Sequence, residues 1–156
     1  RPANVDGEQQ LFGLLKAIVD GTHGLPVVFP VHPRTAKNLR EAGKTLPSMH
    51  YVDPLGYLEF NYLVKHARGV ITDSGGITEE TTVLGVPCLT LRDNTERPET
   101  VTIGTNELIG TDPRKLPPAL ARVMAGQWKK GAIPPKWDGK AAERIVAHLK
   151  DLLAGQ

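Results

Sequence analysis

The sequence predicts an α/β fold, a parallel sheet with helices on both faces. Short apolar segments that suit single strands alternate with longer segments in which apolar residues recur at helical spacing. The strand-like segments are apolar nearly throughout, as expected for strands covered on both faces. In such sheets, ligands bind at the carboxyl ends of the strands, so functional residues are expected in the loops that follow the strands.

The first predicted helix spans residues 8–20. Its apolar residues are spaced for one buried stripe and are Leu11, Leu14, Leu15, Ile18 and Val19. Asp6 is its expected cap and Gly21 its expected end. Residues 25–31 then form an apolar run that predicts a strand.

The remainder of the chain repeats this alternation. Strands are predicted at residues 49–52, 69–72, 86–91 and 106–109. Helices are predicted at residues 34–42, 58–66, 77–84, 114–125 and 139–153. Trp128 precedes a proline-rich segment, residues 132–138, and Trp137 lies near the end of it. Both are expected to hold the segment and the last helix against the domain.

The composition narrows the class of protein. A chain of 156 residues with 40% apolar and 23% charged residues suits one globular domain. A net charge of +2 is too small and too dispersed for a nucleic-acid surface. No apolar run approaches the roughly 18 residues of a membrane span. We therefore expect neither nucleic acid nor a membrane as a partner.

The single cysteine, Cys88, can build neither a disulfide framework nor a cysteine metal site. It is expected to be a small buried residue, and a lone thiol suits a reducing cytoplasm. The histidines show no metal-binding spacing, so no metal is expected.

The segment Asp73-Ser74-Gly75-Gly76 stands between a predicted strand and a predicted helix. A helix N-terminus has unpaired amide hydrogens and a partial positive charge, and glycines let a phosphate approach the backbone. Ser74 adds a hydroxyl donor. These are the ingredients of an anion site, although neither a P-loop nor a dinucleotide fingerprint is present. The alternative is that Asp73 or Ser74 only caps the helix and the glycines only make a tight turn.

Two acids, Glu79 and Glu80, follow the glycines. The helix dipole stabilises acids in a first turn, which by itself accounts for both. Glu80, however, is one turn beyond the glycines, where a carboxylate can accept hydrogen bonds from ribose hydroxyls, as acids do in nucleotide sites. A nucleotide is therefore a better expectation than bare phosphate.

The stretch TDSGGITEE and the stretch LGVPCLTLRDNTERPETVTIGTNELIGTD resemble the non-hydrolysing UDP-N-acetylglucosamine 2-epimerases. The resemblance extends to residues 1–6, 29–33 and 137–145, and so to nearly the whole chain. It implies a two-domain enzyme of the GT-B type, with a UDP-sugar cleft between two Rossmann-like domains. Residues 1–156 would be the carboxyl-terminal, UDP-binding domain.

By motif position, the resemblance implies substrate contacts at Ser74, Gly75, Gly76, Glu80, Phe60 and Arg97. The serine and the glycines would bind the diphosphate, and the glutamate would bind the ribose hydroxyls. The phenylalanine would lie near the uracil, and the arginine would build the phosphate side of the cleft.

Arg1 and His32 match positions that contact an allosteric UDP-sugar in some family members. The family's catalytic histidine would directly precede Arg1, and its catalytic acids belong to the amino-terminal domain. The chain is thus expected to contain no catalytic residue and to be unable to epimerise alone. Its start reads as a loop after a strand, so we expect a piece of a longer protein cut just after its first strand.

The resemblance also implies the reaction. UDP is eliminated across C1–C2 to give a 2-acetamidoglucal, and its re-addition gives UDP-N-acetylmannosamine, without a cofactor. This domain would stabilise the departing diphosphate. The intact protein is expected to be a cytoplasmic homodimer that serves cell-envelope polysaccharide synthesis.

Three alternatives stay open. A donor domain of a GT-B glycosyltransferase would also use a glycine turn and a ribose-binding acid. A hydrolysing epimerase and a non-catalytic nucleotide-binding module are the others. The loop of residues 92–99 favours the epimerase, and within it Asp93 and Glu96 are expected to pair with Arg92 or Arg97.

Overall fold

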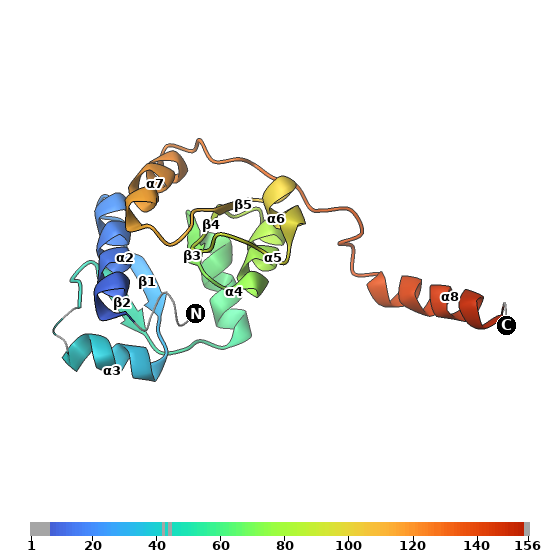
Figure 1. The fold of residues 1–156 in the computed structure, drawn as a ribbon, viewed down its shortest axis with the longest axis horizontal. Coiled ribbons are helices and arrows are strands. Elements are labelled where there is room, and N and C mark those ends of the chain that lie inside the picture. The colour runs from blue at the N-terminus through green and yellow to red at the C-terminus, as the bar shows by residue number, and fades with distance from the viewer. Residues whose placement is uncertain (1–6, 42, 44, 155–156) are drawn as a thin grey trace.

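The computed structural model describes residues 7–41, 43 and 45–154, which form an α/β body from which the last helix extends (Figure 1). Asp6, the expected cap of the first helix, lies outside the described residues. The elements in chain order are α2 (Glu8–Gly21), β1 (Val27–Pro30), α3 (Pro33–Glu41), β2 (Met49–Val52), α4 (Tyr57–His66), β3 (Val70–Thr72), α5 (Gly75–Leu84), β4 (Cys88–Thr90), α6 (Pro98–Thr102), β5 (Asn106–Leu108), η1 (Pro113–Lys115), α7 (Leu116–Met124) and α8 (Ala141–Ala154).

The strands are all parallel, which confirms the predicted α/β class. They form two sheets rather than one continuous sheet, with orders β1-β2 and β3-β4-β5. Among the described residues, no strand joins β1 to β3. In a doubly wound sheet of order 3-2-1-4-5-6, the first strand separates the second from the fourth. The two observed sheets correspond to the 3-2 and 4-5-6 parts of that order.

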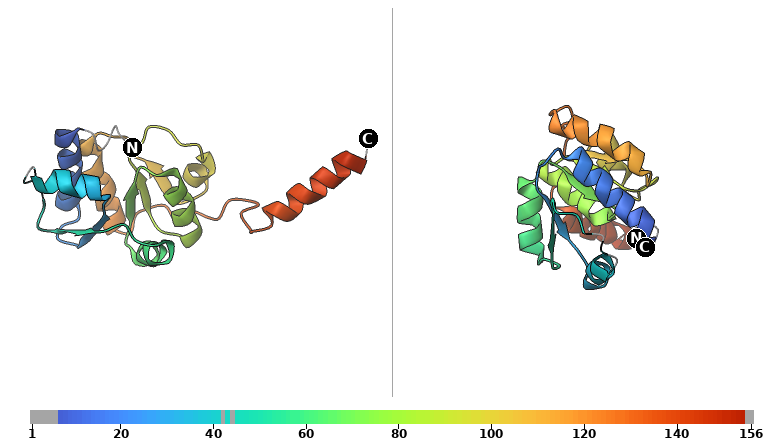
Figure 2. Two further views of the ribbon diagram at one scale, coloured as in Figure 1. Left: turned by 90° about the horizontal axis from the view of Figure 1, so that it is seen from below. Right: turned by 90° about the vertical axis from the view of Figure 1, so that its left-hand side faces the viewer.

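The apolar core lies where α2 packs against α7 and the strands. The stripe predicted for the first helix is confirmed, since Leu11, Leu14, Leu15 and Ile18 are all buried. At the end of α2, a Cβ added to Gly21 would lie 2.7 Å from Leu120 Cδ1, so the two helices approach closely at that glycine. The core holds α7 on the body, and Figure 2 shows the same arrangement from two further sides.

A second buried region consists of polar side chains. We call it the threonine core, and its members are Thr78, Thr81, Thr82, Thr90, Thr100, Thr105 and Asn106. Thr90 Oγ1 donates to Asn106 Oδ1 at 2.6 Å, and Asn106 Nδ2 donates to Thr100 Oγ1 at 3.3 Å. Thr100 Oγ1 in turn donates to the carbonyl of Arg97 at 2.7 Å. These bonds tie β4 and β5 to the loop that precedes α6.

The α8 helix extends away from the body in Figures 1 and 2, and none of its residues is buried. Trp128 packs as expected, being buried and donating from Nε1 to the carbonyl of Thr105 at 2.7 Å. The expectation that the tryptophans also hold the last helix against the body is wrong, because the large apolar side chains of α8 are exposed by half or more and none is buried. Within the described part of the chain, no helix is long and apolar enough to cross a membrane.

Candidate functional site

The α5 helix begins at Gly75, two residues before the predicted start at residue 77. Gly75 and Gly76 are therefore the first residues of the helix, and Ser74 is its N-cap with extended backbone. The first amides of a helix have no partner within it, so they are available to an anion. The Ser74 side chain makes no capping hydrogen bond, so the capping alternative applies to its backbone position and not to its hydroxyl.

The chain's own packing does not require glycine at these two positions. A Cβ on Gly76 would meet no atom within 4 Å, and one on Gly75 would make only ordinary contacts, at 3.6 Å or more. Neither residue has a positive φ. Gly104 is different, since a Cβ there would lie 2.7 Å from the carbonyl oxygen of Thr100. The fold thus explains Gly104, whereas Gly75 and Gly76 leave room beside the backbone that the chain itself does not use.

Arg92 follows β4 at the same carboxyl edge of the sheet, where Thr72 and Thr90 lie in register. Its side chain is only 5% exposed, and it is the one charged side chain among the buried residues of the described chain. Its guanidinium donates to Glu96 Oε1 at 2.8 Å and to Glu96 Oε2 at 3.3 Å, which confirms the expected pairing for Glu96 but does not test it for Asp93. These hydrogen bonds, with the charges of Glu96 and Asp73, raise the pKa of Arg92 despite its burial.

Arg97 lies further along the same loop and is exposed. Its Nε donates to Glu79 Oε1 of α5, and this bond raises the pKa of Arg97. The structure thus brings Arg97 to the first turns of α5, where the sequence places the anion site. The ion pair is half exposed, so solvent screens it and it can open at little cost.

Glu80 lines a shallow groove of about 450 Å³ between α4 and α5. The other lining residues are Tyr57, Asn61, Glu79, Val83, Leu84 and Trp137. Glu80 thus shares this groove with two aromatic residues, Tyr57 and Trp137. Sequence reasoning missed Tyr57 and Trp137 here, because the groove joins a helix N-terminus to a segment about 80 residues later in the chain.

The other predicted site residues lie apart from this groove or outside the described residues. Phe60 is half-buried on α4 and is not part of the groove lining. His32 is exposed and lies between β1 and α3, at the carboxyl edge of the other sheet. Arg1 lies outside the described residues.

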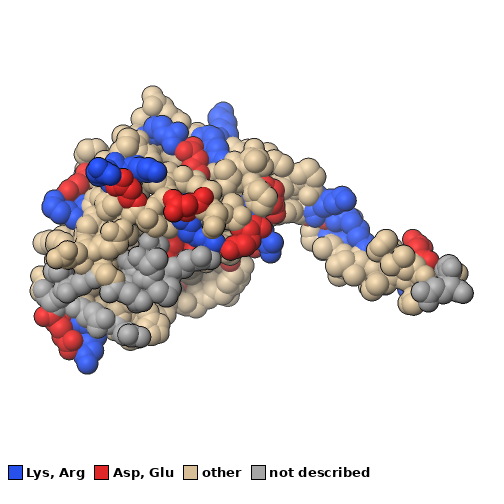
Figure 3. Space-filling view, viewed as in Figure 1, with Lys and Arg blue, Asp and Glu red and all other residues tan. Residues whose placement is uncertain are grey.

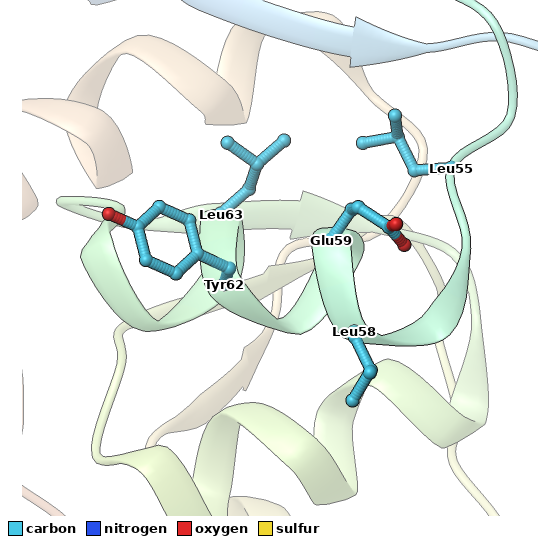
Figure 4. Close-up of a pocket in the computed structure, with 5 residues that line it drawn as sticks. All are labelled: Leu55, Leu58, Glu59, Tyr62 and Leu63. Carbon is cyan, nitrogen blue, oxygen red and sulfur yellow. The ribbon is translucent and has the colours of Figure 1, made fainter.

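A second hollow, of about 440 Å³, is nearly apolar and contains none of the predicted site residues. Leu55 comes from the loop before α4, and Leu58, Glu59, Tyr62 and Leu63 come from α4 itself (Figure 4). With one carboxylate as its only charged group, this hollow has no positive charge that would attract a phosphate.

Basic and acidic side chains are mixed on the surface, as the small net charge of +2 suggests. Lys and Arg side chains are interspersed with Asp and Glu on the face shown in Figure 3, without a continuous basic patch. Among the described residues, no group of three or more His, Cys, Asp or Glu side chains is placed to hold a metal ion.

Comparison with known proteins places this chain in a family. Residues 1–150 match the family model described as UDP-N-acetylglucosamine 2-epimerase. A protein of that name from Methanocaldococcus jannaschii is 41% identical over 96% of this chain and 42% of its own length. One from Escherichia coli K12 is 35% identical over 93% of this chain and 40% of its own length. The chain therefore spans about two fifths of these relatives.

Solved structures agree with the fold. The M. jannaschii UDP-GlcNAc 2-epimerase, crystallised with UDP-GlcNAc and UDP, matches with a TM-score of 0.78 and 40% identity, over 96% of this chain and 43% of that one. Staphylococcus aureus MnaA, solved with UDP, matches with a TM-score of 0.76 and 31% identity, over 94% of this chain and 41% of that one. This chain belongs to the UDP-N-acetylglucosamine 2-epimerase family.

Proposed function

We propose that this chain is the UDP-binding domain of a UDP-N-acetylglucosamine 2-epimerase. The whole protein would interconvert UDP-N-acetylglucosamine and UDP-N-acetylmannosamine by elimination and re-addition of UDP. The observation that carries the proposal is the pair of glycines at the start of α5, which the fold itself does not require. A diphosphate that lies against the backbone does require them, because a side chain would hold it away from the amides.

The diphosphate binds at the first turn of α5. The amides there supply hydrogen bonds, the helix dipole supplies partial positive charge, and Ser74 supplies a hydroxyl. Arg97 leaves Glu79 and donates to a phosphate oxygen, which its exposed position permits. During elimination, negative charge grows on the departing diphosphate, and these groups stabilise that charge.

The nucleoside extends from the diphosphate into the groove between α4 and α5. Glu80 lines this groove and accepts hydrogen bonds from the ribose hydroxyls, while its charge stays away from the phosphates. Phe60 lies near the uracil. Tyr57 is the aromatic residue of α4 that lines the groove beside Glu80.

The catalytic residues and the second wall of the cleft belong to an amino-terminal domain that precedes these residues in the whole protein. A first strand between β1 and β3 would join the two sheets into one, and the observed strand orders support this. His32 and Arg1 belong to a second UDP-sugar contact in the whole protein, which acts as a cytoplasmic homodimer.

Calorimetry with UDP and uridine tests the proposal on this chain. We expect UDP to bind more tightly than uridine. Gly76→Ala is expected to lower the affinity for UDP by about tenfold or more, because a charge-assisted hydrogen bond is lost. It is not expected to lower the free energy of unfolding. Gly13→Ala is the matched control, since it also replaces a helical glycine whose added Cβ meets only Pro113 Cγ, at 3.9 Å. Equal affinities for UDP and uridine would contradict the diphosphate site.

The ribose contact has its own test. Glu80→Gln is expected to lower the affinity for UDP more than the affinity for pyrophosphate, because pyrophosphate has no hydroxyls to donate to the carboxylate. If both ligands lose the same affinity, Glu80 does not bind the ribose.

A further inference from the structure

Arg92 is a buried cation whose hydrogen bonds are incomplete. Its Nη1 and Nη2 reach Glu96, and Nη2 also lies 3.4 Å from Asn94 Oδ1. Its Nε is buried and has no hydrogen-bond partner among the described residues. Removing a guanidinium from water is costly unless it is paired and fully hydrogen-bonded. A loop-shaping role alone would be filled more cheaply by a neutral side chain.

The position of this cation explains why a charge is kept there. Arg92 Nη1 and Glu96 Oε2 lie 3.7 Å and 3.6 Å from the point that a Cβ of Gly75 would occupy. Both groups therefore border the space beside the first turn of α5 that the glycines leave open. One of them attracts an anion in that space and the other repels it.

The two partners differ in their freedom to move. The Arg92 side chain is 5% exposed and fixed by its surroundings, whereas the Glu96 side chain is 67% exposed. Glu96 can therefore turn outward into water at little cost, while the guanidinium stays. Arginine binds phosphate with the same two-pronged geometry with which it binds a carboxylate.

We propose that Arg92 binds the diphosphate and that Glu96 is a displaceable counter-ion, which holds the guanidinium in the empty site and is expelled when the diphosphate binds. This inference rests on the proposed function and adds a second phosphate-binding arginine and a competing carboxylate to it. Glu96 keeps the buried charge paired between binding events. It also lowers the affinity for the diphosphate, which favours release.

The sign of the Glu96 effect is the test. In calorimetry with UDP, Glu96→Gln is expected to bind at least about threefold more tightly than the unmodified chain, because a competing and repelling charge is gone. Arg92→Lys is expected to bind about tenfold more weakly, because lysine lacks the two-pronged donor. Uridine, which has no phosphate, is expected to bind all forms equally.

Glu107→Gln is the matched control. Glu107 pairs with Arg122, so its replacement changes the net charge equally and also removes the carboxylate partner of an arginine. We expect it to leave UDP affinity unchanged. An equal gain in Glu107→Gln and Glu96→Gln would reduce the effect to general charge and overturn the proposal.

The remaining outcomes separate the two proposals. If the unmodified chain prefers UDP over uridine but Glu96→Gln binds UDP equally or more weakly, Glu96 does not compete and this inference is wrong, while the proposed function stands. If the unmodified chain does not prefer UDP, the proposed function fails and this inference fails with it. Because Glu96 is exposed, its variant is expected to fold even if Arg92→Lys does not.

Discussion

The α5 helix buries polar side chains, whereas the α8 helix exposes apolar ones. α5 has no strong apolar stripe, yet Thr78, Thr81 and Thr82 on it are almost completely buried. α8 has a regular apolar stripe, yet its stripe residues are all exposed by half or more: Ile145, Val146, Leu149, Leu152 and Leu153. The pattern of apolar residues thus identified a helix in α8 but gave no information on whether it is packed.

The difference follows from how each helix satisfies its polar groups. Thr78 Oγ1 donates to the carbonyl of Gly75 at 2.6 Å, and Thr82 Oγ1 donates to that of Thr78 at 2.8 Å. These bonds satisfy the hydroxyls within α5, so the threonines can be buried without a polar partner from elsewhere. An apolar stripe has no such internal solution, because it needs another surface to cover it. Whether a helix is buried therefore depends on the surfaces around it as much as on its own sequence.

The largest expected effect comes from the same substitution made in the two regions. Leu89 in β4 has no exposed surface, and Leu89→Ala is expected to lower the free energy of unfolding by about 2–5 kcal/mol. Leu149 in α8 is 50% exposed, and Leu149→Ala is expected to change the free energy of unfolding by less than about 0.5 kcal/mol. Urea unfolding of both variants measures the difference. Similar losses would mean that α8 is packed on the body in solution.

A smaller loss is expected in the threonine core. Asn106→Ala removes the partner of both Thr90 and Thr100, and is expected to cost about 1–3 kcal/mol because buried hydroxyls lose hydrogen bonds. The control is Asn61→Ala, because the Asn61 side chain donates a hydrogen bond to the carbonyl of Tyr57 at an exposed position. If both variants unfold at the same urea concentration, the polar network does not stabilise this half of the body.

The smallest effect concerns two aspartates that pair with arginines, one on the body and one beside α8. The Arg114 hydrogen bonds lower the pKa of Asp112 from 3.8 to about 2, and Arg144 lowers that of Asp138. A lowered pKa stabilises the folded state above its ordinary value, and this contribution is lost as the pH falls through the folded value. Asp112→Asn is therefore expected to flatten the loss of stability between pH 3.8 and about 2.

Asp138→Asn serves as the comparison, because it pairs with α8 and not with the body. In the Asp138→Asn variant, the stability of the body is expected to depend on pH as it does in the unmodified chain. Unfolding followed by Trp128 fluorescence in a Trp137→Phe background reports on the body alone, since Trp128 is buried there. A flattened curve for Asp138→Asn would show that α8 and the body unfold together.

Much of the fold could be predicted from local patterns. The helix at residues 8–20 and the strand at 49–52 are where the sequence places them, because each has a clear apolar pattern. α6 was missed, since its five residues are too few for a periodic pattern, although proline at its start is a usual signal. The two-sheet arrangement was also missed, because pairing between strands depends on segments distant in the chain.

The candidate site could be predicted only where its residues are close together in the sequence. The residues 74–76 are adjacent, and their glycines mark a helix start whose position was wrong by two residues. The pairing of Glu96 with an arginine was predicted, but the burial of Arg92 was not, because a charged residue in a loop is usually exposed. Its only signal was its place directly after a strand, at the edge where ligands bind.

Cys88 gives this chain an internal probe of its own motions. It is the single cysteine, it has no exposed surface, and it lies in β4 between the two other strands of its sheet. Burial raises its pKa, which further suppresses its reaction with thiol reagents in the closed form. The rate at which such a reagent labels the protein therefore measures how often the sheet beside the start of α5 opens. A bound nucleotide that stabilises that sheet would slow the labelling, without any mutation or attached dye.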